Sequence, residues 1–174
     1  MSFIKNVNKY YGSKEDVNKL IRYCGNSVSV KNCGFFGVNP LSYIDAIESM
    51  YRIKKRFNQE NGQQVLHFVV SIYRKSNSDM DHLIMYAENV MNKIGYQLEG
   101  MGFQNIAFIH AKRAKIYEAE IGSPNVHIHF VVNTINVFNG HRMRNVKNIL
   151  NYFLSQLKRD VFFKSLNWEY VTMG

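Results

Sequence analysis

Hydrophobic residues recur at helical spacing in four stretches of the chain. The first begins with the polar run Ser13-Lys14-Glu15-Asp16, continues with apolar residues at i, i+3, i+4 and i+7, and ends at Gly25. The other three extend from Pro40 to about Phe57, from about Asp79 to Ile94 before Gly95, and from about Val146 to Phe162. These spacings predict four amphipathic helices, each with one face turned to a core.

Strand-like segments lie between and after the predicted helices. The segment Val65–Tyr73 is rich in β-branched and aromatic residues and almost continuously apolar, which predicts a buried central strand. Shorter strands are predicted at Ser27–Val30, Ile106–His110, Val126–Val132 and Ile135–Phe138, the last turning back at Asn139-Gly140.

The order of these elements favours an α+β fold over a doubly wound parallel sheet. The third and fourth predicted strands are joined by a loop of about fifteen residues, which is long for a connection. Gly34-Phe35-Phe36-Gly37 does not match the G-x-G-x-x-G turn of nucleotide-binding folds, and we interpret it as a flexible loop. The sequence predicts a central, mostly antiparallel sheet of about five strands covered by helices. Its 174 residues fit one domain over residues 1–174.

The composition adds a strong positive charge to this picture. Lysine and arginine number 22 against 13 acidic residues, so the formal net charge is +9 at pH 7, and 46% of the residues are hydrophobic. A globular protein with this charge is expected to bind a polyanion, and nucleic acid is the first candidate. The longest apolar runs fall far short of the ~20 residues that a membrane span needs.

Three basic clusters are expected to follow a nucleic-acid backbone, although each is also compatible with an ordinary solvated surface. They lie on the second predicted helix, in the long loop before residue 126, and after the Asn139-Gly140 turn. Their members are Arg52, Lys54, Lys55, Arg56, Lys112, Arg113, Lys115, Arg142, Arg144 and Lys147.

The cysteines and the N-terminus indicate a reducing compartment. Cys24 and Cys33 are the only cysteines, and they match neither a C-x-x-C zinc site nor a disulfide scaffold. We interpret both as reduced structural thiols. The first residues, Met1-Ser2-Phe3-Ile4-Lys5, lack the zones of a secretory signal, so the predicted location is the cytoplasm.

Two of the six histidines lie on one face of a predicted strand. In His127-Ile128-His129 the two-residue period of a strand places both imidazoles on the same side, about 7 Å apart. His110 ends the preceding predicted strand, which lies beside this one if the loop between them is a hairpin connection. Three imidazoles that converge in this way would hold one divalent cation and leave coordination positions for a substrate.

The other histidines and the tyrosines complete the candidate chemistry. His67 lies within the Val65–Tyr73 strand, and we interpret it as a hydrogen-bonded histidine behind the metal, with a ligand role as the alternative. His82 and His141 are expected in solvent. A cation beside DNA suggests phosphoryl transfer, which needs a nucleophile. Eleven tyrosines are present, but a phenol with a pKa near 10 is a poor nucleophile unless a cation or a base stabilises its oxyanion.

Four segments, in their order along the chain, resemble the relaxase (mobilization nuclease) family of HUH single-strand DNA endonucleases, the conjugative-transfer type. They are Asp16-Val17-Asn18-Lys19-Leu20-Ile21-Arg22-Tyr23, Leu66-His67-Phe68-Val69-Val70-Ser71, Ile109-His110, and His127-Ile128-His129-Phe130-Val131-Val132-Asn133-Thr134-Ile135-Asn136. Rolling-circle replication initiators instead place a Y-x-x-K helix after the histidine motif, and neither Tyr152 nor Tyr170 has a lysine three residues later. The tyrosine before the motif therefore favours the relaxase branch.

The resemblance implies a palm-like HUH fold and the cleavage of single-stranded or hairpin DNA at a transfer origin. It implies Tyr23 as the nucleophile and His110, His127 and His129 as ligands of a divalent cation, manganese or magnesium. The implied reaction leaves a 5′-phosphotyrosine and a free 3′-hydroxyl, so that the strand can be rejoined. Accessory relaxosome proteins and a coupling protein are the further partners that the resemblance implies.

Several alternatives stay open at this point. Tyr10 and Tyr11 are fallback nucleophiles. Relatives often carry an acidic residue two positions after the first histidine, where this chain has Lys112, and the acid that orients a histidine is open among Glu88, Glu118 and Glu120. A missing ligand or nucleophile would indicate a non-catalytic DNA-binding accessory protein with the same fold, and a rolling-circle replication initiator is the remaining alternative.

Overall fold

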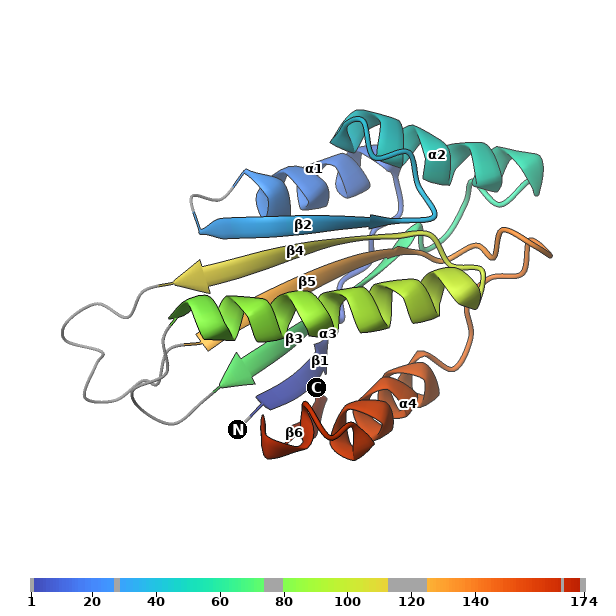
Figure 1. Ribbon diagram of the computed structural model, residues 1–174. Helices are drawn as coiled ribbons and strands as arrows, with labels where there is room; N and C mark the ends of the chain where they lie inside the picture. The colour runs from blue at the N-terminus through green and yellow to red at the C-terminus, as the bar shows by residue number, and fades with distance from the viewer. Residues whose placement is uncertain (1, 27–28, 74–79, 113–124, 167, 173–174) are drawn as a thin grey trace.

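A six-stranded sheet forms the centre of the fold in the computed structural model, which describes residues 2–26, 29–73, 80–112, 125–166 and 168–172 (Figure 1). The elements, in chain order, are β1 (Ser2–Asn6), α1 (Lys14–Gly25), β2 (Val30–Phe36), α2 (Tyr43–Arg56), β3 (Val65–Tyr73), α3 (Met80–Gly100), β4 (Asn105–Lys112), β5 (Asn125–Asn133), α4 (Val146–Arg159), a 3₁₀ turn (Lys164–Leu166) and β6 (Trp168–Thr172). The strands lie in the order β2-β4-β5-β3-β1-β6. Neighbouring strands are antiparallel except for β1 and β6, so the α+β class and the mostly antiparallel sheet are confirmed.

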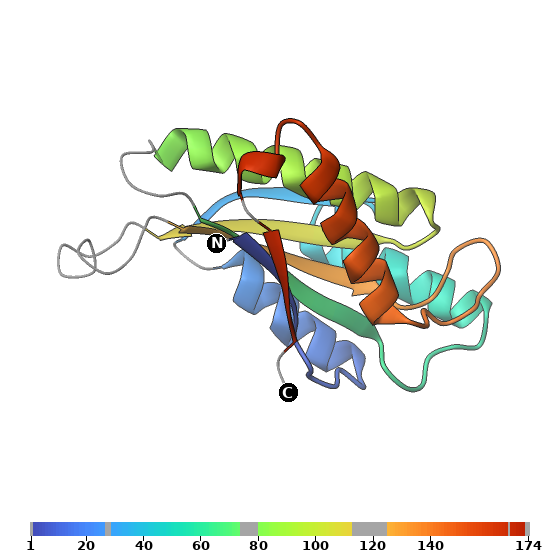
Figure 2. The same ribbon diagram turned by 90° about the horizontal axis from the view of Figure 1, so that it is seen from below.

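Helices cover both faces of the sheet (Figures 1 and 2). On one face α1 and α2 enclose a core with Val65, Phe108 and Val131 of the central strands. On the other face α3 and α4 pack over a larger core that includes Phe68 and Phe130. Successive side chains of a strand point to opposite faces, so the odd and even positions of β3 and β5 supply different cores. No helix among the described residues is long and apolar enough to cross a membrane.

The start of α1 is stabilised by the hydrogen bonds that its sequence predicts. Ser13 Oγ accepts a hydrogen bond from the Asp16 N–H at 3.1 Å, and the Asp16 carboxylate accepts one from the Ser13 N–H at 3.0 Å. The predicted apolar stripe is buried, and it consists of Val17, Leu20, Ile21 and Cys24. This packing fixes the C-terminal end of α1 over the central strands.

The predicted helices have slightly different ends in the structure. α2 begins at Tyr43 rather than Pro40, because Ser42 is the N-cap and its hydroxyl accepts the Asp45 N–H at 3.1 Å. α4 ends at Arg159 rather than near Phe162, since Asp160 already has an extended backbone conformation.

Two interpretations that rested on glycine are wrong. Gly95 does not terminate α3, which continues to Gly100, but provides the space in which the Phe36 ring packs against the helix. A Cβ at residue 95 would lie 2.4 Å from that ring. The segment 34–37 is not a flexible loop, because Gly34 and Phe36 belong to β2, and a Cβ at Gly34 would lie 2.7 Å from the same ring. Both glycines are required by close packing.

The remaining differences concern short strands. β1 and β6 were not predicted, whereas the hairpin expected around Asn139-Gly140 is reduced to a single isolated bridge between Ile135 and Arg142. The Asn136 side chain replaces strand pairing there, since its Oδ1 accepts the Phe138 N–H at 2.9 Å. The strand expected at Ser27–Val30 instead starts at Val30, and residues 27 and 28 lie outside the described residues.

Candidate active site

The antiparallel register of β4 and β5 brings the three predicted ligand histidines together. His110 is paired directly with His127, and His129 follows two residues later on the same face of β5. The ring centroids of His110 and His129 lie 4.6 Å apart. β5 lies between β4 and β3 inside the sheet, so these side chains project from a strand that is paired on both sides. The sheet also places them on the face that α1 and α2 cover.

Each of the three rings has one nitrogen engaged by another protein group. His110 donates its Nε2–H to the Cys24 carbonyl oxygen at 2.7 Å. His127 Nδ1 forms a hydrogen bond with Ser71 Oγ at 2.7 Å, and His129 Nδ1 forms one with His67 Nε2 at 3.1 Å. The opposite nitrogens are Nδ1 of His110 and Nε2 of His127 and His129. In metal sites an imidazole is generally oriented through the nitrogen that does not bind the metal. The ligand atoms of His110, His127 and His129 do not all lie within 4.8 Å of one another, so a cation shared by all three would require these side chains to move closer together.

His67 and Tyr11 extend this network behind His129. Tyr11 Oη and His67 Nδ1 lie 3.2 Å apart, so the hydrogen bonds run from Tyr11 through His67 to His129. Burial lowers the pKa of His67 to about 4. Burial, with smaller contributions from the neighbouring histidines, lowers the pKa of His129 to about 3. Both rings are therefore neutral near pH 7, which is the protonation state that binds a metal.

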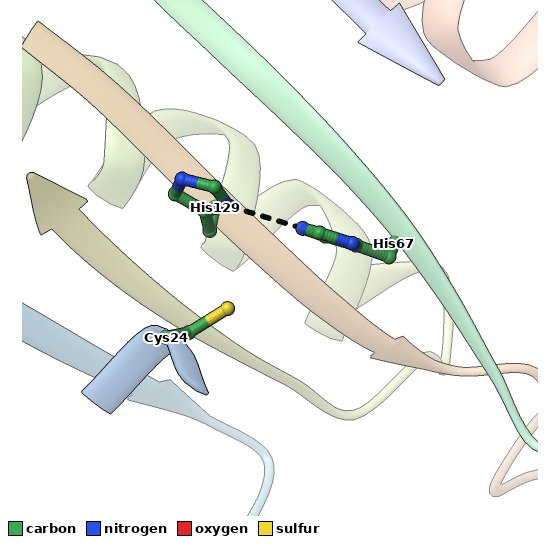
Figure 3. A group of neighbouring side chains, drawn as sticks. All are labelled: Cys24, His67 and His129. Carbon is green, nitrogen blue, oxygen red and sulfur yellow. Dashed lines mark hydrogen bonds between the residues drawn. The ribbon is translucent and has the colours of Figure 1, made fainter. Parts of the chain in front are cut away.

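Cys24 lies beside the same two histidines (Figure 3). Its Sγ and one ring nitrogen each from His67 and His129 lie within 4.8 Å of one another. Among the described residues these three form the compact group of possible metal ligands, and neither His110 nor His127 belongs to it. Both cysteines are free thiols, as predicted, and burial raises the pKa of Cys24 to about 12.

Tyr23 lies at the edge of the histidine cluster. Two adjoining cavities, of about 520 and 550 Å³, are both lined by Tyr23 and His129. His110 and His127 line the first cavity, and His67 lines the second. The Tyr23 side chain is 70% exposed, so its hydroxyl is accessible to a DNA strand.

The two fallback tyrosines are placed differently from Tyr23. Tyr11 is buried and hydrogen-bonded to His67, and burial raises the pKa of its phenol. Tyr10 is exposed but is absent from the lining of both cavities. Of the three tyrosines considered, Tyr23 combines exposure with a place beside the three histidines.

Three lysines that the sequence analysis did not single out line the cavities. Lys5 lines the first cavity, and Lys9 and Lys19 line the second. Lys19 precedes Tyr23 by four residues and therefore shares its face of α1, a relation that the sequence already contains. Lys5 and Lys9 depend on the position of β1, which the sequence pattern did not reveal.

Two of the predicted DNA-binding residues have structural roles instead. Lys54 is fully buried, and its ammonium donates hydrogen bonds to the Gln64 carbonyl oxygen and to Asn133 Oδ1. Burial and, to a smaller extent, the nearby Arg142 lower the pKa of Lys54 to about 7. The Arg142 guanidinium donates to the carbonyl oxygens of Gln63 and Asn61, which holds the loop between α2 and β3. Neither side chain is free to bind a phosphate.

The other predicted site residues are placed as follows. Of the basic residues, Arg52, Lys55, Arg56, Arg144 and Lys147 are exposed but line neither cavity. The Lys112 side chain and residues 113 and 115 lie outside the described part of the chain. His82 and His141 are exposed, as expected. Glu88 accepts a hydrogen bond from Asn32 Nδ2, while residues 118 and 120 are not described; the group that orients His129 is His67.

A comparison with known protein families identifies the family of this chain. Residues 23–159 match the family description "Relaxase: MobA/VirD2-like, nuclease domain", and the chain belongs to this family. Comparisons with curated proteins and with solved structures gave no significant match. From the family match, the protein is a relaxase nuclease domain, which binds and nicks DNA during conjugative mobilization. Relaxases of this family generally use a divalent metal ion.

Proposed function

We propose that this domain nicks single-stranded DNA at one site of a transfer origin with Tyr23 as the nucleophile, and that it rejoins the same strand. The observation that carries the proposal is the cavity shared by the Tyr23 side chain and the predicted ligands His110, His127 and His129. A scissile phosphate in this cavity would lie between an accessible phenol and three imidazoles.

The proposed reaction is an in-line displacement at phosphorus. Tyr23 Oη forms a bond to the phosphorus and loses its proton, while the bond from the phosphorus to the 3′-oxygen breaks. The 3′-oxygen takes up a proton and leaves as a hydroxyl, and the 5′-phosphate stays on Tyr23. Because one phosphodiester replaces another, the 3′-hydroxyl can reverse the reaction without a nucleotide triphosphate.

We assign the divalent cation, manganese or magnesium, to His110, His127 and His129. A cation bound there would offset the charge that develops on the non-bridging phosphate oxygens. For His129 to offer Nε2, its Nδ1 must carry the proton and donate it to His67 Nε2. His67 then carries its own proton on Nδ1 and donates it to Tyr11 Oη. The Tyr11–His67 pair is compatible with this tautomer of His129, because the Tyr11 hydroxyl can accept a hydrogen bond as well as donate one.

The surroundings of the cavities supply contacts for a single strand. Lys5, Lys9 and Lys19 are placed to neutralise phosphates beside the scissile one. Phe3 lines the first cavity and stacks on Tyr73, with ring centroids 5.8 Å apart. Tyr73 in turn contacts the His127 ring edge to face. Aromatic rings next to a basic groove are the usual partners of unpaired bases.

The proposal is tested with the variant Tyr23→Phe, which removes only the hydroxyl. Incubation with single-stranded origin DNA and manganese, followed by denaturing electrophoresis, measures the covalent protein–DNA adduct. We expect the adduct to disappear in Tyr23→Phe while the affinity for DNA is unchanged, because an exposed hydroxyl contributes little to folding. Tyr10→Phe is the matched control and should form the adduct normally. An undiminished adduct in Tyr23→Phe would overturn the assignment, and no adduct with the parent chain would favour the non-catalytic accessory protein.

The metal ligands are tested by calorimetric titration with manganese. His110→Ala should lower the manganese affinity strongly but leave most of the DNA affinity, because backbone contacts by lysines do not pass through the ion. His141→Ala, at an exposed histidine, is the control and should bind manganese like the parent. If His110→Ala also binds manganese as tightly as the parent, His110 is not a ligand and His67 becomes the third ligand.

A further inference from the structure

Cys24, His67 and His129 form a second group of possible metal ligands. It shares only His129 with the three histidines to which the catalytic cation was assigned above. The three donor atoms of this second group lie within 4.8 Å of one another (Figure 3). The facing nitrogens, His67 Nε2 and His129 Nδ1, are 3.1 Å apart, close to the roughly 3.3 Å between two nitrogens bound to one tetrahedral zinc ion. The separation of the two nitrogens therefore matches a shared cation, which would lie off the line between them once the two rings turn toward it.

The donor types favour a thiophilic cation. A cysteine sulfur with two imidazole nitrogens suits Zn²⁺, whereas Mn²⁺ and Mg²⁺ prefer oxygen ligands. His67 and His129 both line the cavity of about 550 Å³, so an ion can reach them from solvent. The cavity also leaves room for water as the fourth ligand, while Cys24 contributes its sulfur from the buried side of α1.

We propose that Cys24, His67 and His129 bind Zn²⁺, and that zinc in this position excludes the cation required for nicking. The Cys24 thiol releases its proton to solvent as Sγ binds zinc, and His67 Nε2 and His129 Nδ1 supply their lone pairs. His129 then carries its one proton on Nε2, the nitrogen assigned above to the catalytic cation. A neutral imidazole has a single lone pair for a metal, so His129 cannot bind both ions. The exclusion rests on the proposed function, whereas the zinc site does not.

Cobalt provides a direct test of the zinc site, because a cysteine thiolate bound to Co²⁺ gives a charge-transfer band in the near ultraviolet. The whole chain is titrated with Co²⁺, and Zn²⁺ is then added to displace it. We expect one thiolate band that zinc abolishes, that is missing in Cys24→Ser and that persists in Cys33→Ser. Cys33 is the matched control because it is the other free thiol and lies on β2. Cys24→Ala takes the place of Cys24→Ser if the serine variant does not fold.

The zinc affinity should fall by about 10- to 100-fold or more in Cys24→Ser, since even the loss of an outer hydrogen-bond partner costs that much. A missing band, or a band of equal strength in Cys24→Ser, would overturn the zinc site.

The exclusion is measured separately by titrating manganese into zinc-loaded protein. We expect weaker manganese binding in the parent and normal binding in Cys24→Ser exposed to the same zinc. Zinc and manganese could instead bind independently in a chain that shows the cobalt–thiolate band. That result would overturn the exclusion and the assignment of His129 to the catalytic cation, but the zinc site would stand.

Discussion

His129 is the side chain on which most contacts of the site converge. It forms a hydrogen bond with His67, its ring lies against His110, and it lines both cavities together with Tyr23. Burial keeps it neutral, so under the roles proposed for it the tautomer of His129, rather than its charge, would decide which ion it binds. The tautomer of His129 is coupled to the direction of the hydrogen bonds that run from Tyr11 through His67 to His129.

The lowered pKa values of His67 and His129 predict how stability depends on pH. Both values, about 4 and about 3, lie below the ordinary 6.5, so the unfolded chain binds more protons between these limits. The free energy of unfolding of the metal-free protein should therefore decrease as the pH falls below 6.5. Each residue contributes a slope of at most about 1.4 kcal/mol per pH unit. Urea unfolding with a chelator, between pH 4.5 and 7.5, measures the slope.

His67→Gln separates this effect from general acid unfolding. The variant cannot take up the proton, so its stability should fall less steeply with acidification than that of the parent. His141→Gln changes an exposed histidine and should keep the parent slope. Identical slopes for the parent and His67→Gln would contradict the prediction.

Lys54 shows that a charged residue type does not by itself indicate a surface position. Ile47, Met50, Tyr51 and Lys54 follow the i, i+3, i+4, i+7 spacing and are all buried on α2. The periodicity therefore places Lys54 in the core, although its charge suggested the surface. The carbonyl of Gln64 and the amide of Asn133 make the burial possible. Gln64 follows in the loop after α2, whereas Asn133 is 79 residues away in β5, and no local pattern connects it to α2.

At the scale of elements, the contact between α3 and β2 depends on the absence of a side chain at Gly95. A Cβ there would lie 2.4 Å from the Phe36 ring, so Gly95→Ala should destabilise the fold by about 1 to 3 kcal/mol through overpacking. Gly100→Ala is the matched control on the same helix, because nothing lies within 4 Å of its Cβ position. Thermal or urea unfolding measures both, and equal stabilities of the two variants would contradict the packing role of Gly95.

The elements that could be predicted are those whose pattern is complete within one segment. β3 has the predicted bounds, and α1 has the predicted start and stripe. β1 and β6 have five residues each, and they are recognisable as strands only through their partners, which are β3 and β6 for β1 and β1 for β6. The histidine face could be predicted from β5 alone, because strand alternation is local. A hydrogen-bonded His67 was also predicted from its strand, but its partners His129 and Tyr11 were not, because they depend on the β3–β5 register and on the segment after β1.

At the scale of the whole molecule, two groups of basic side chains could bind DNA. One group lines the cavities beside the histidines, and the other lies on the exposed face of α2. Lys9→Ala and Lys19→Ala should each weaken binding of single-stranded DNA and lower the slope of log affinity against log salt concentration by about 0.7, the contribution of one phosphate. Fluorescence anisotropy at several salt concentrations measures the slope. Arg52→Ala and Lys55→Ala, on the exposed face of α2, are the controls and should keep the parent slope. If only the α2 variants lower the slope, the DNA follows α2 rather than the cavities.

The short segment between β1 and α1 imposes a length requirement on the molecule. The Val7 N–H donates to the His67 carbonyl oxygen at 2.9 Å, and the Gln64 N–H donates to the Tyr11 carbonyl oxygen at 2.8 Å, so both ends of this segment are tied to the start of β3. The Ser13 cap of α1 follows two residues after Tyr11. An added or deleted residue here would displace α1, and Tyr23 with it, relative to the histidines. Otherwise it would break the Tyr11–His67 contact. Evolutionary change in the length of this connection is therefore expected to be rare compared with substitution at its exposed positions.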